Sequence, residues 1–110
     1  MQIKALQFKK EDKTEVAIYV YFCEGMSDRE WRIDDIRYME FRKRNWISLS
    51  KSFADSYDYR RLSMYDRKIY ELKKYIDFVG ADRLKEAIMN AWEQLKPDVE
   101  NMFSDISKTG

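Results

Sequence analysis

The spacing of apolar residues changes near Ser63 from a two-residue period to a helical period, and this change limits the fold more than any other feature of the chain. Before this point apolar and polar residues alternate as in strands, whereas after it apolar residues recur every three or four positions, as on one face of a helix. Strands followed by helices favour an α+β arrangement. We therefore predict an antiparallel sheet of about four strands in two hairpins, followed by two to three amphipathic helices packed on one face.

The first hairpin is predicted from two apolar segments, residues 3–8 and 14–23, on either side of the charged stretch 9–13. The second segment has the clearest alternation, and it is rich in β-branched and aromatic residues on both sides. One side carries Val16, Ile18, Val20 and Phe22, and the other carries Ala17, Tyr19 and Tyr21. We therefore expect both faces of this strand to be at least partly covered.

The second hairpin is predicted at 35–41 and 46–53, with a polar turn at 42–45. A competing interpretation starts a helix at Ser27, because Ser27 and Glu30 have the spacing of a capping box and the helix would run to Arg44. The alternation of Met39 and Phe41 fits strands better than a helix, on which the apolar residues of this stretch would scatter around the axis.

Three helices are predicted after Ser63. Ser63 is the expected N-cap of the first and Gly80 its end, Asp82 is the expected cap of the second, and Pro97 separates the second from a short third. Their apolar stripes are Tyr65, Ile69, Leu72, Ile76 and Val79; then Leu84, Ala87, Ile88, Ala91, Trp92 and Leu95; then Val99, Met102, Phe103 and Ile106.

The length of 110 residues predicts a single α+β domain over 1–110, with strands mainly in 1–55 and helices in 63–107. Neither an apolar run near 18 residues nor a charged-then-apolar leader occurs in the sequence, so we expect a cytoplasmic protein that does not contact membranes. Cys23 is the single cysteine and is expected to act as a small hydrophobe.

The composition argues against most enzyme classes. The chain has no His, one Cys and three Gly, so the usual general base, a zinc cluster and a glycine-rich phosphate loop are all missing. We expect no catalytic residues, no cofactor and no bound metal. The remaining candidate is a carboxylate group of Asp34, Asp35 and Glu40 beside basic residues, of the kind that holds Mg²⁺ in nucleases. Dense charge often produces such neighbours by chance.

Residues 37–75 combine nine aromatic residues with eleven Lys or Arg and only five acids. Aromatic faces offer stacking area, and Arg and Lys bind carboxylates or phosphates, so this segment suits a surface that holds another macromolecule. We expect a small non-enzymatic protein-binding or inhibitory accessory module, of the type that phages and mobile elements carry. The alternative is a nucleic-acid-binding protein, but the net charge of only +1 favours a protein partner.

The expected partner-binding residues are aromatic and basic residues of this segment together with Phe78. They are Trp46, Tyr57, Tyr59, Arg60, Arg61, Arg67, Tyr70, Lys74 and Phe78, and under the nucleic-acid alternative Arg42, Lys43, Arg44 and Lys51 bind the phosphate backbone.

Four of these residues, Arg67, Tyr70, Lys74 and Phe78, lie opposite the apolar stripe of the first helix. A helix face of this kind needs a cover, which is the third helix, a second copy in a homodimer, or another protein.

Overall fold

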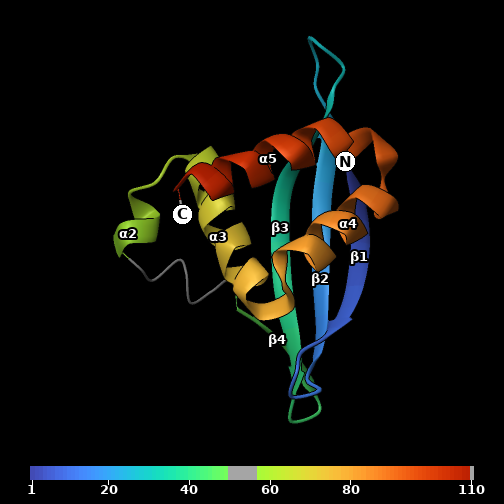
Figure 1. Ribbon diagram of the computed structural model, residues 1–110, viewed down its shortest axis with the longest axis vertical. Coiled ribbons are helices and arrows are strands. Elements are labelled where there is room, and N and C mark those ends of the chain that lie inside the picture. The colour runs from blue at the N-terminus through green and yellow to red at the C-terminus, as the bar shows by residue number, and fades with distance from the viewer. Residues whose placement is uncertain (50–56, 110) are drawn as a thin grey trace.

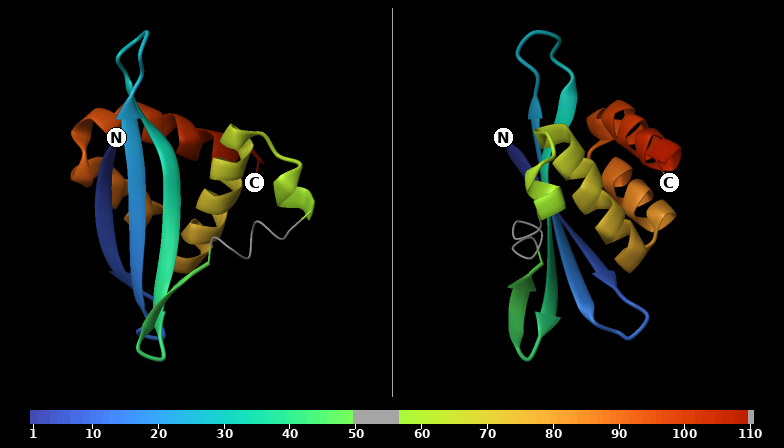
Figure 2. Two further views of the ribbon diagram at one scale, coloured as in Figure 1. Left: turned by 180° about the vertical axis from the view of Figure 1, so that it is seen from behind. Right: turned by 90° about the vertical axis from the view of Figure 1, so that its left-hand side faces the viewer.

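The computed structural model describes residues 1–49 and 57–109, and it confirms the predicted α+β fold. A four-stranded antiparallel sheet has the strand order β1-β2-β3-β4. Helices α3, α4 and α5 all lie on one side of this sheet (Figures 1 and 2). The elements are β1 Gln2–Lys9, β2 Glu15–Glu24, β3 Trp31–Arg42, β4 Asn45–Ser48, α2 Tyr57–Arg60, α3 Met64–Val79, α4 Ala81–Ala91, the 3-10 helix η1 Glu93–Leu95 and α5 Lys96–Thr109.

Strand β3 is longer than expected, and the helical interpretation of residues 27–44 is wrong. The Asp28 carboxylate accepts a hydrogen bond from the Glu30 N–H, and the Gly25 N–H donates to the Glu30 carbonyl. These bonds close a loop between β2 and β3 in place of a helix N-terminus. The register against β2 shifts between Tyr21 and Phe22, where Asp34 is the extra residue of a bulge.

Strand β4 is shorter than the predicted segment 46–53. It pairs with the end of β3 from Asn45 to Ser48, and the Leu49 N–H still donates to the Tyr38 carbonyl. The rest of the predicted strand, from residue 50 onward, lies outside the described residues.

The boundaries of α3 follow the predicted caps, but two boundaries of the later helices differ. The second helix, α4, ends at Ala91 and not at Pro97, which lies in the first turn of α5. The Ser63 hydroxyl accepts a hydrogen bond from the Asp66 N–H, and Gly80 ends α3 with a φ of 94°. The predicted cap of the second helix, Asp82, is wrong, because Gly80 is also the N-cap of α4 and Asp82 lies in its first turn. An acid there still interacts favourably with the helix dipole.

The core lies between the sheet and the helices, and all three predicted stripes contribute to it. Tyr65 is the exception, because its ring is exposed and its hydroxyl donates to Asp105. Tyr75 is buried in its place and stacks on Tyr38 with ring centroids 5.1 Å apart. The fully buried side chains include Ile18, Val20, Phe22, Ile33, Ile36, Tyr38, Leu72, Tyr75, Leu84, Ile88, Leu95, Val99 and Met102.

The part of β3 that β4 does not reach is hydrogen-bonded by helix side chains. The Asp98 carboxylate of α5 accepts from the Ile33 N–H at 2.8 Å, and the Lys68 ammonium of α3 donates to the Ile33 carbonyl at 2.9 Å. The Tyr75 hydroxyl donates to the Ile36 carbonyl. These contacts satisfy edge groups that would otherwise be available for pairing with another chain.

Candidate functional site

The central strand β2 carries no charged residue between Glu15 and Glu24. Its helix-facing side chains are buried. Its other side presents Ala17, Tyr19, Tyr21 and Cys23, and the last three of these are partly exposed. The solvated face of an antiparallel sheet usually carries polar residues, whereas strands covered on both faces are apolar throughout. The expectation that both faces of β2 are at least partly covered is confirmed, because Ala17 is buried and Tyr19, Tyr21 and Cys23 are half-buried, although none of the described helices lies on their side.

Neighbouring strands continue this apolar surface, because residues paired across an antiparallel ladder point to the same face. Ile3 lies opposite Tyr21, Met39 opposite Ala17, and Trp46 opposite Phe41. Figure 2 (left) shows the sheet from this side with no helix in front of β1, β2 or β3. We define the helix-free face as Ile3, Ala5, Gln7, Lys9, Glu15, Ala17, Tyr19, Tyr21, Cys23, Arg32, Asp35, Arg37, Met39, Phe41, Trp46 and Ser48.

Charges on the helix-free face largely neutralise one another. The Arg37 Nε lies 3.1 Å from an Asp35 carboxylate oxygen, and the Arg37 Cζ lies 5.0 Å from the centroid of the Tyr21 ring. The hydrogen bond to Asp35 raises the pKa of Arg37. Lys9 lies opposite Glu15 in the ladder. The face is therefore apolar with paired charges, and it does not form a basic surface.

Two exposed aromatic side chains of this face lie at one end of it, in the β3–β4 hairpin. Phe41 and Trp46 are 40% and 42% exposed, and their rings contact each other with centroids 5.3 Å apart, whereas the exposed Ile47 lies opposite Glu40 on the other side of the hairpin. The hairpin projects beyond the helices in Figure 1. Single exposed hydrophobic residues are common on protein surfaces, whereas exposed aromatic rings that contact each other are typical of interaction surfaces.

The hairpin turn holds two basic residues in the left-handed region, with φ of 49° at Lys43 and 66° at Arg44. A two-residue turn with positive φ at both central positions favours Asn-Gly, because side chains with a Cβ are strained there. Neither Lys43 nor Arg44 forms an ion pair or hydrogen bond with the described part of the chain. Strain of this kind is often retained where a side chain has a function.

A buried carboxylate fixes the base of the hairpin. Glu40 is fully buried and accepts hydrogen bonds from Lys10 Nζ at 3.0 Å, the Tyr38 hydroxyl at 2.9 Å and Arg42 Nε at 2.7 Å. Burial acts to raise the pKa of Glu40, but the hydrogen bonds from Lys10, Tyr38 and Arg42 outweigh it and lower this pKa. Burial and the bond to Glu40 raise the pKa of Tyr38. Arg42 is therefore held against the protein by its ion pair with Glu40.

Comparison with known proteins assigns no family. No family model, curated protein or solved structure matches the chain. The function of this surface has to be argued from its own chemistry.

Most of the predicted partner-binding residues in α2 and α3 contact one another. Tyr59 and Tyr70 have ring centroids 5.7 Å apart, the Arg67 guanidinium lies 5.1 Å from the centroid of Tyr59, and Lys74 Nζ lies 5.5 Å from that of Tyr70. The Tyr59 hydroxyl also donates to the buried Glu71 carboxylate. This cluster packs α2 against α3.

Phe78 packs on the core instead of forming a separate helix face. Its ring centroid lies 5.1 Å from that of Tyr38, and Lys10 Nζ lies 5.3 Å from the Phe78 centroid. The buried stripe of α3 includes Tyr75, which turns the helix so that Phe78 reaches the sheet. The face of α3 that carries Tyr70 and Phe78 is therefore covered by α2 and by the chain's own sheet.

The other predicted site residues are dispersed. Arg60 and Arg61 are exposed near the end of α2, whereas Lys51 and the Tyr57 side chain lie outside the described residues. Of the predicted residues, Trp46 and the basic group Arg42, Lys43 and Arg44 come together, at the tip of the β3–β4 hairpin.

The carboxylates considered for Mg²⁺ do not converge. Asp35 pairs with Arg37 on the helix-free face, whereas Glu40 points toward the helices and bonds to Lys10, Tyr38 and Arg42. Among residues 1–49 and 57–109, no group of three Asp, Glu, Cys or His side chains is placed to hold a metal ion. Within the same residues, no helix is long and apolar enough to span a bilayer.

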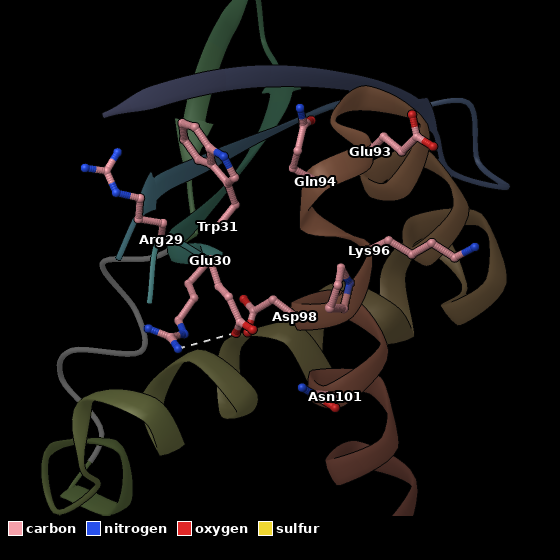
Figure 3. Close-up of a pocket in the computed structure, with 10 residues that line it drawn as sticks. Arg29, Glu30, Trp31, Glu93, Gln94, Lys96, Asp98 and Asn101 are labelled. Atoms are coloured by element: carbon pink, nitrogen blue, oxygen red, sulfur yellow. Dashed lines mark ion pairs between the residues drawn. The ribbon is translucent and has the colours of Figure 1, made fainter. Parts of the chain in front are cut away.

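Two surface cavities in the described part of the chain do not resemble ligand-binding pockets. One of about 550 Å³ lies between the β2–β3 loop and the start of α5 (Figure 3). Its charged side chains have both signs, and two of them, Glu30 and Arg32, pair with each other. Asp98, which also lines it, is hydrogen-bonded to the Ile33 N–H. A second cavity of about 630 Å³, beside Gly80, is likewise lined by charges of both signs. Neither cavity has the predominantly apolar lining of most ligand pockets.

Several residues of the helix-free face were not predicted as site residues, namely Ile3, Tyr19, Tyr21, Met39 and Phe41. One signal for them is present in the sequence, because β2 lacks charge on both of its sides. The sequence does not show which side of β2 the helices leave open. It also does not show which residues of β1, β3 and β4 lie on that side, because this depends on the register between strands.

Proposed function

We propose that this chain is a small non-enzymatic module that binds another protein chain on the helix-free face of its sheet. The observation that carries the proposal is the charge-free central strand, whose outward Tyr19, Tyr21 and Cys23 are left partly exposed. Together with Phe41 and Trp46 of the hairpin they form a surface of the residue types that dominate protein interfaces.

The charge balance supports a protein partner over a nucleic acid. Acids and bases are interspersed on the face, and Arg37 is already paired with Asp35. A surface that binds phosphate backbones normally carries a clear excess of unpaired Lys and Arg. The expectation that docking inhibits the partner, as phage and mobile-element accessory proteins do, stays a prediction.

Replacing Phe41 and Trp46 together by Ser is expected to abolish partner capture while costing about 1 kcal/mol or less of stability, since only one exposed cross-strand pair is lost. The measurement is affinity capture from lysate, with thermal unfolding of each variant. Changing Met64 and Tyr65 to Ser is the matched control, because these exposed residues lie on α3. Undiminished capture by the hairpin variant, or equal loss in the control, would contradict the proposal.

Nucleic-acid binding remains a second candidate because Lys43 and Arg44, which form no ion pair within residues 1–49 and 57–109, lie beside the exposed rings of Phe41 and Trp46. Aromatic rings on an open sheet face can stack on bases. The change Lys43→Asn with Arg44→Gly removes both charges and supplies the residues that the turn favours. Under our proposal this variant still captures its partner, also after nuclease treatment of the lysate. Capture that nuclease or this double change abolishes would favour nucleic acid.

A further inference from the structure

We infer that the outer edge of β1 binds an extended, acidic segment of a different protein, which adds a strand to the sheet. The inference goes beyond the proposed function, because this edge is a second surface and a strand can add to it whatever occupies the helix-free face. Three features support it: the open backbone of β1, the apolar side chains beside it and the positive charges that flank them.

The two edges of the sheet differ in how they are protected. At one edge β4 has only four residues, and the part of β3 beyond it is hydrogen-bonded by Asp98, Lys68 and Tyr75. At the other edge β1 has eight residues, contains no Pro and pairs with β2 from Gln2 to Lys9 without a register shift. Natural edge strands that avoid pairing are usually short, bulged or covered, and β1 is none of these.

The backbone of β1 is open along this edge. Roughly half of the N–H and C=O groups of an edge strand point away from its one neighbour. Within residues 1–49 and 57–109, no backbone group outside β2 and no side chain hydrogen-bonds to these groups of β1. Figure 1 shows β1 as the outermost strand, with α4 on the helix side of it. Only another extended segment can pair with such a row of groups.

Apolar side chains line the helix side of the edge. Leu6 and Phe8 pair with buried residues of β2, pack against the core and stay partly exposed. The Lys4 ammonium lies on the same side, 5.5 Å from the centroid of Trp92. The Arg83 guanidinium of α4 lies 5.6 Å from the centroid of Phe8. An added strand would therefore place every second side chain against Leu6, between two cations.

These charges favour an acidic partner over a second copy of the chain. Among the residues that the structure describes, neither Lys4 nor Arg83 forms an ion pair. Glu11 and Asp12 line a cavity with Arg83, but they lie beyond β1 in the turn to β2. Because β1 itself carries lysines and no acid, a second copy of β1 brings only further positive charge to the edge. A strand with acids at the facing positions gains opposite-charge pairs.

The spacing predicts the side chains of the added strand. Lys4, Leu6 and Phe8 follow one another at every second residue on one side of β1. Side chains directly opposite them should be acidic, apolar and acidic in turn, with the last acid reaching Arg83 above Phe8. This order reads the same in both directions, so a parallel or an antiparallel strand satisfies it.

The probe is a synthetic peptide with blocked ends, Thr-Glu-Thr-Val-Thr-Glu-Thr, whose Glu and Val side chains share one side when it is extended. Amide hydrogen exchange, followed by NMR during a titration, locates its binding. In the free chain we expect the β1 amides that point away from β2 to exchange fast. Saturating peptide should slow their exchange and leave the amides of α5 unchanged.

Charge exchange tests the chemistry of the occupant. The wild type should bind this peptide about tenfold or more tightly than the peptide with Lys in place of both Glu residues. Lys4→Glu with Arg83→Glu should reverse that preference. Both residues are exposed, so we expect this variant to fold, and thermal unfolding checks it. Lys85→Glu is the control, because Lys85 lines a cavity with Ser104 of α5. The comparison of the two peptides on the wild type needs no substitution.

Slow exchange of all β1 amides in the free chain would overturn the inference, because the edge would already be paired. A titration that does not slow exchange in β1, or equal affinity of the wild type for the two peptides, would also overturn it. Phe41→Ser with Trp46→Ser should leave peptide binding unchanged. If the peptide binds at β1 but Phe41 and Trp46 capture no partner, only the proposed function fails. If they capture a partner and the peptide does not bind, only this inference fails.

Discussion

Deletion of residues 97–110 is expected to leave the rest of the chain unfolded. Val99, Met102 and Phe103 of α5 are buried in the core, and burying each such side chain contributes about 1.5–3 kcal/mol. The deletion also removes Asp98 and leaves the Ile33 N–H without its acceptor. These losses together approach the whole stability of a typical domain, about 5–15 kcal/mol.

Circular dichroism and urea unfolding measure this effect. Met102→Ala gives a graded version with an expected cost of about 2–5 kcal/mol. Asn101→Ala, on the exposed side of the same helix, is the control and should change stability by less than about 0.5 kcal/mol. A truncated chain that still unfolds cooperatively would show that the sheet, α3 and α4 make a sufficient core by themselves.

Glu40→Ala is expected to destabilise the fold by about 2–4 kcal/mol, because it leaves the buried Tyr38 hydroxyl without an acceptor and releases Lys10 and Arg42. Lys10 and Arg42 are partly exposed and can be hydrated, so the loss stays below that of a fully buried ion pair. Glu40→Gln keeps an acceptor for Tyr38 and should cost less. Glu86→Ala, on an exposed position of α4, is the control.

The stabilisation from Glu40 should depend on pH. Its pKa in the folded protein lies below the ordinary value of 4.5, so its contribution is complete above about pH 4.5 and is lost as the pH falls through the lowered pKa. Urea unfolding between neutral and acidic pH should show a loss of stability in the wild type that is smaller in Glu40→Gln. Equal acid sensitivity in both proteins would contradict this role.

Glu71 should behave in the opposite way. Burial raises its pKa, so its ionised form is disfavoured in the folded protein, and Glu71→Gln should not reduce stability at neutral pH.

The sheet and the helices could be predicted because their local signals agree with the tertiary structure. The alternation of Val16, Ile18, Val20 and Phe22 matches the buried side of β2. Ser63 caps the start of α3 and Gly80 caps its end, as predicted from their chemistry. Sequence alone could not distinguish the loop at Ser27–Glu30 from a helix N-terminus with a capping box. The same Asp28 carboxylate that suits a helix N-terminus also closes the turn.

The proposed binding surface was only partly predictable. The turn at 42–45 could be predicted, and the hairpin keeps Lys43, Arg44 and Trp46 close together because they are neighbours in sequence. Tyr59, Tyr70 and Phe78 have the residue types of an interface, but the structure uses them to hold α2 and the sheet against α3. Aromatic residues contribute equally to cores and interfaces, so composition cannot distinguish these roles.

The most direct test of the proposed binding surface is hydroxyl-radical footprinting of the free chain and of the chain bound to a captured partner. Trp46 on the helix-free face and Tyr65 on α3 are both 42% exposed in the free chain, so they form an internally matched pair. We predict that binding suppresses oxidation of Trp46 and Phe41 and leaves that of Tyr65 and Met64 unchanged. Protection of Tyr65 and Met64, with Trp46 oxidised as in the free chain, would contradict the claim that the helix-free face is the binding surface.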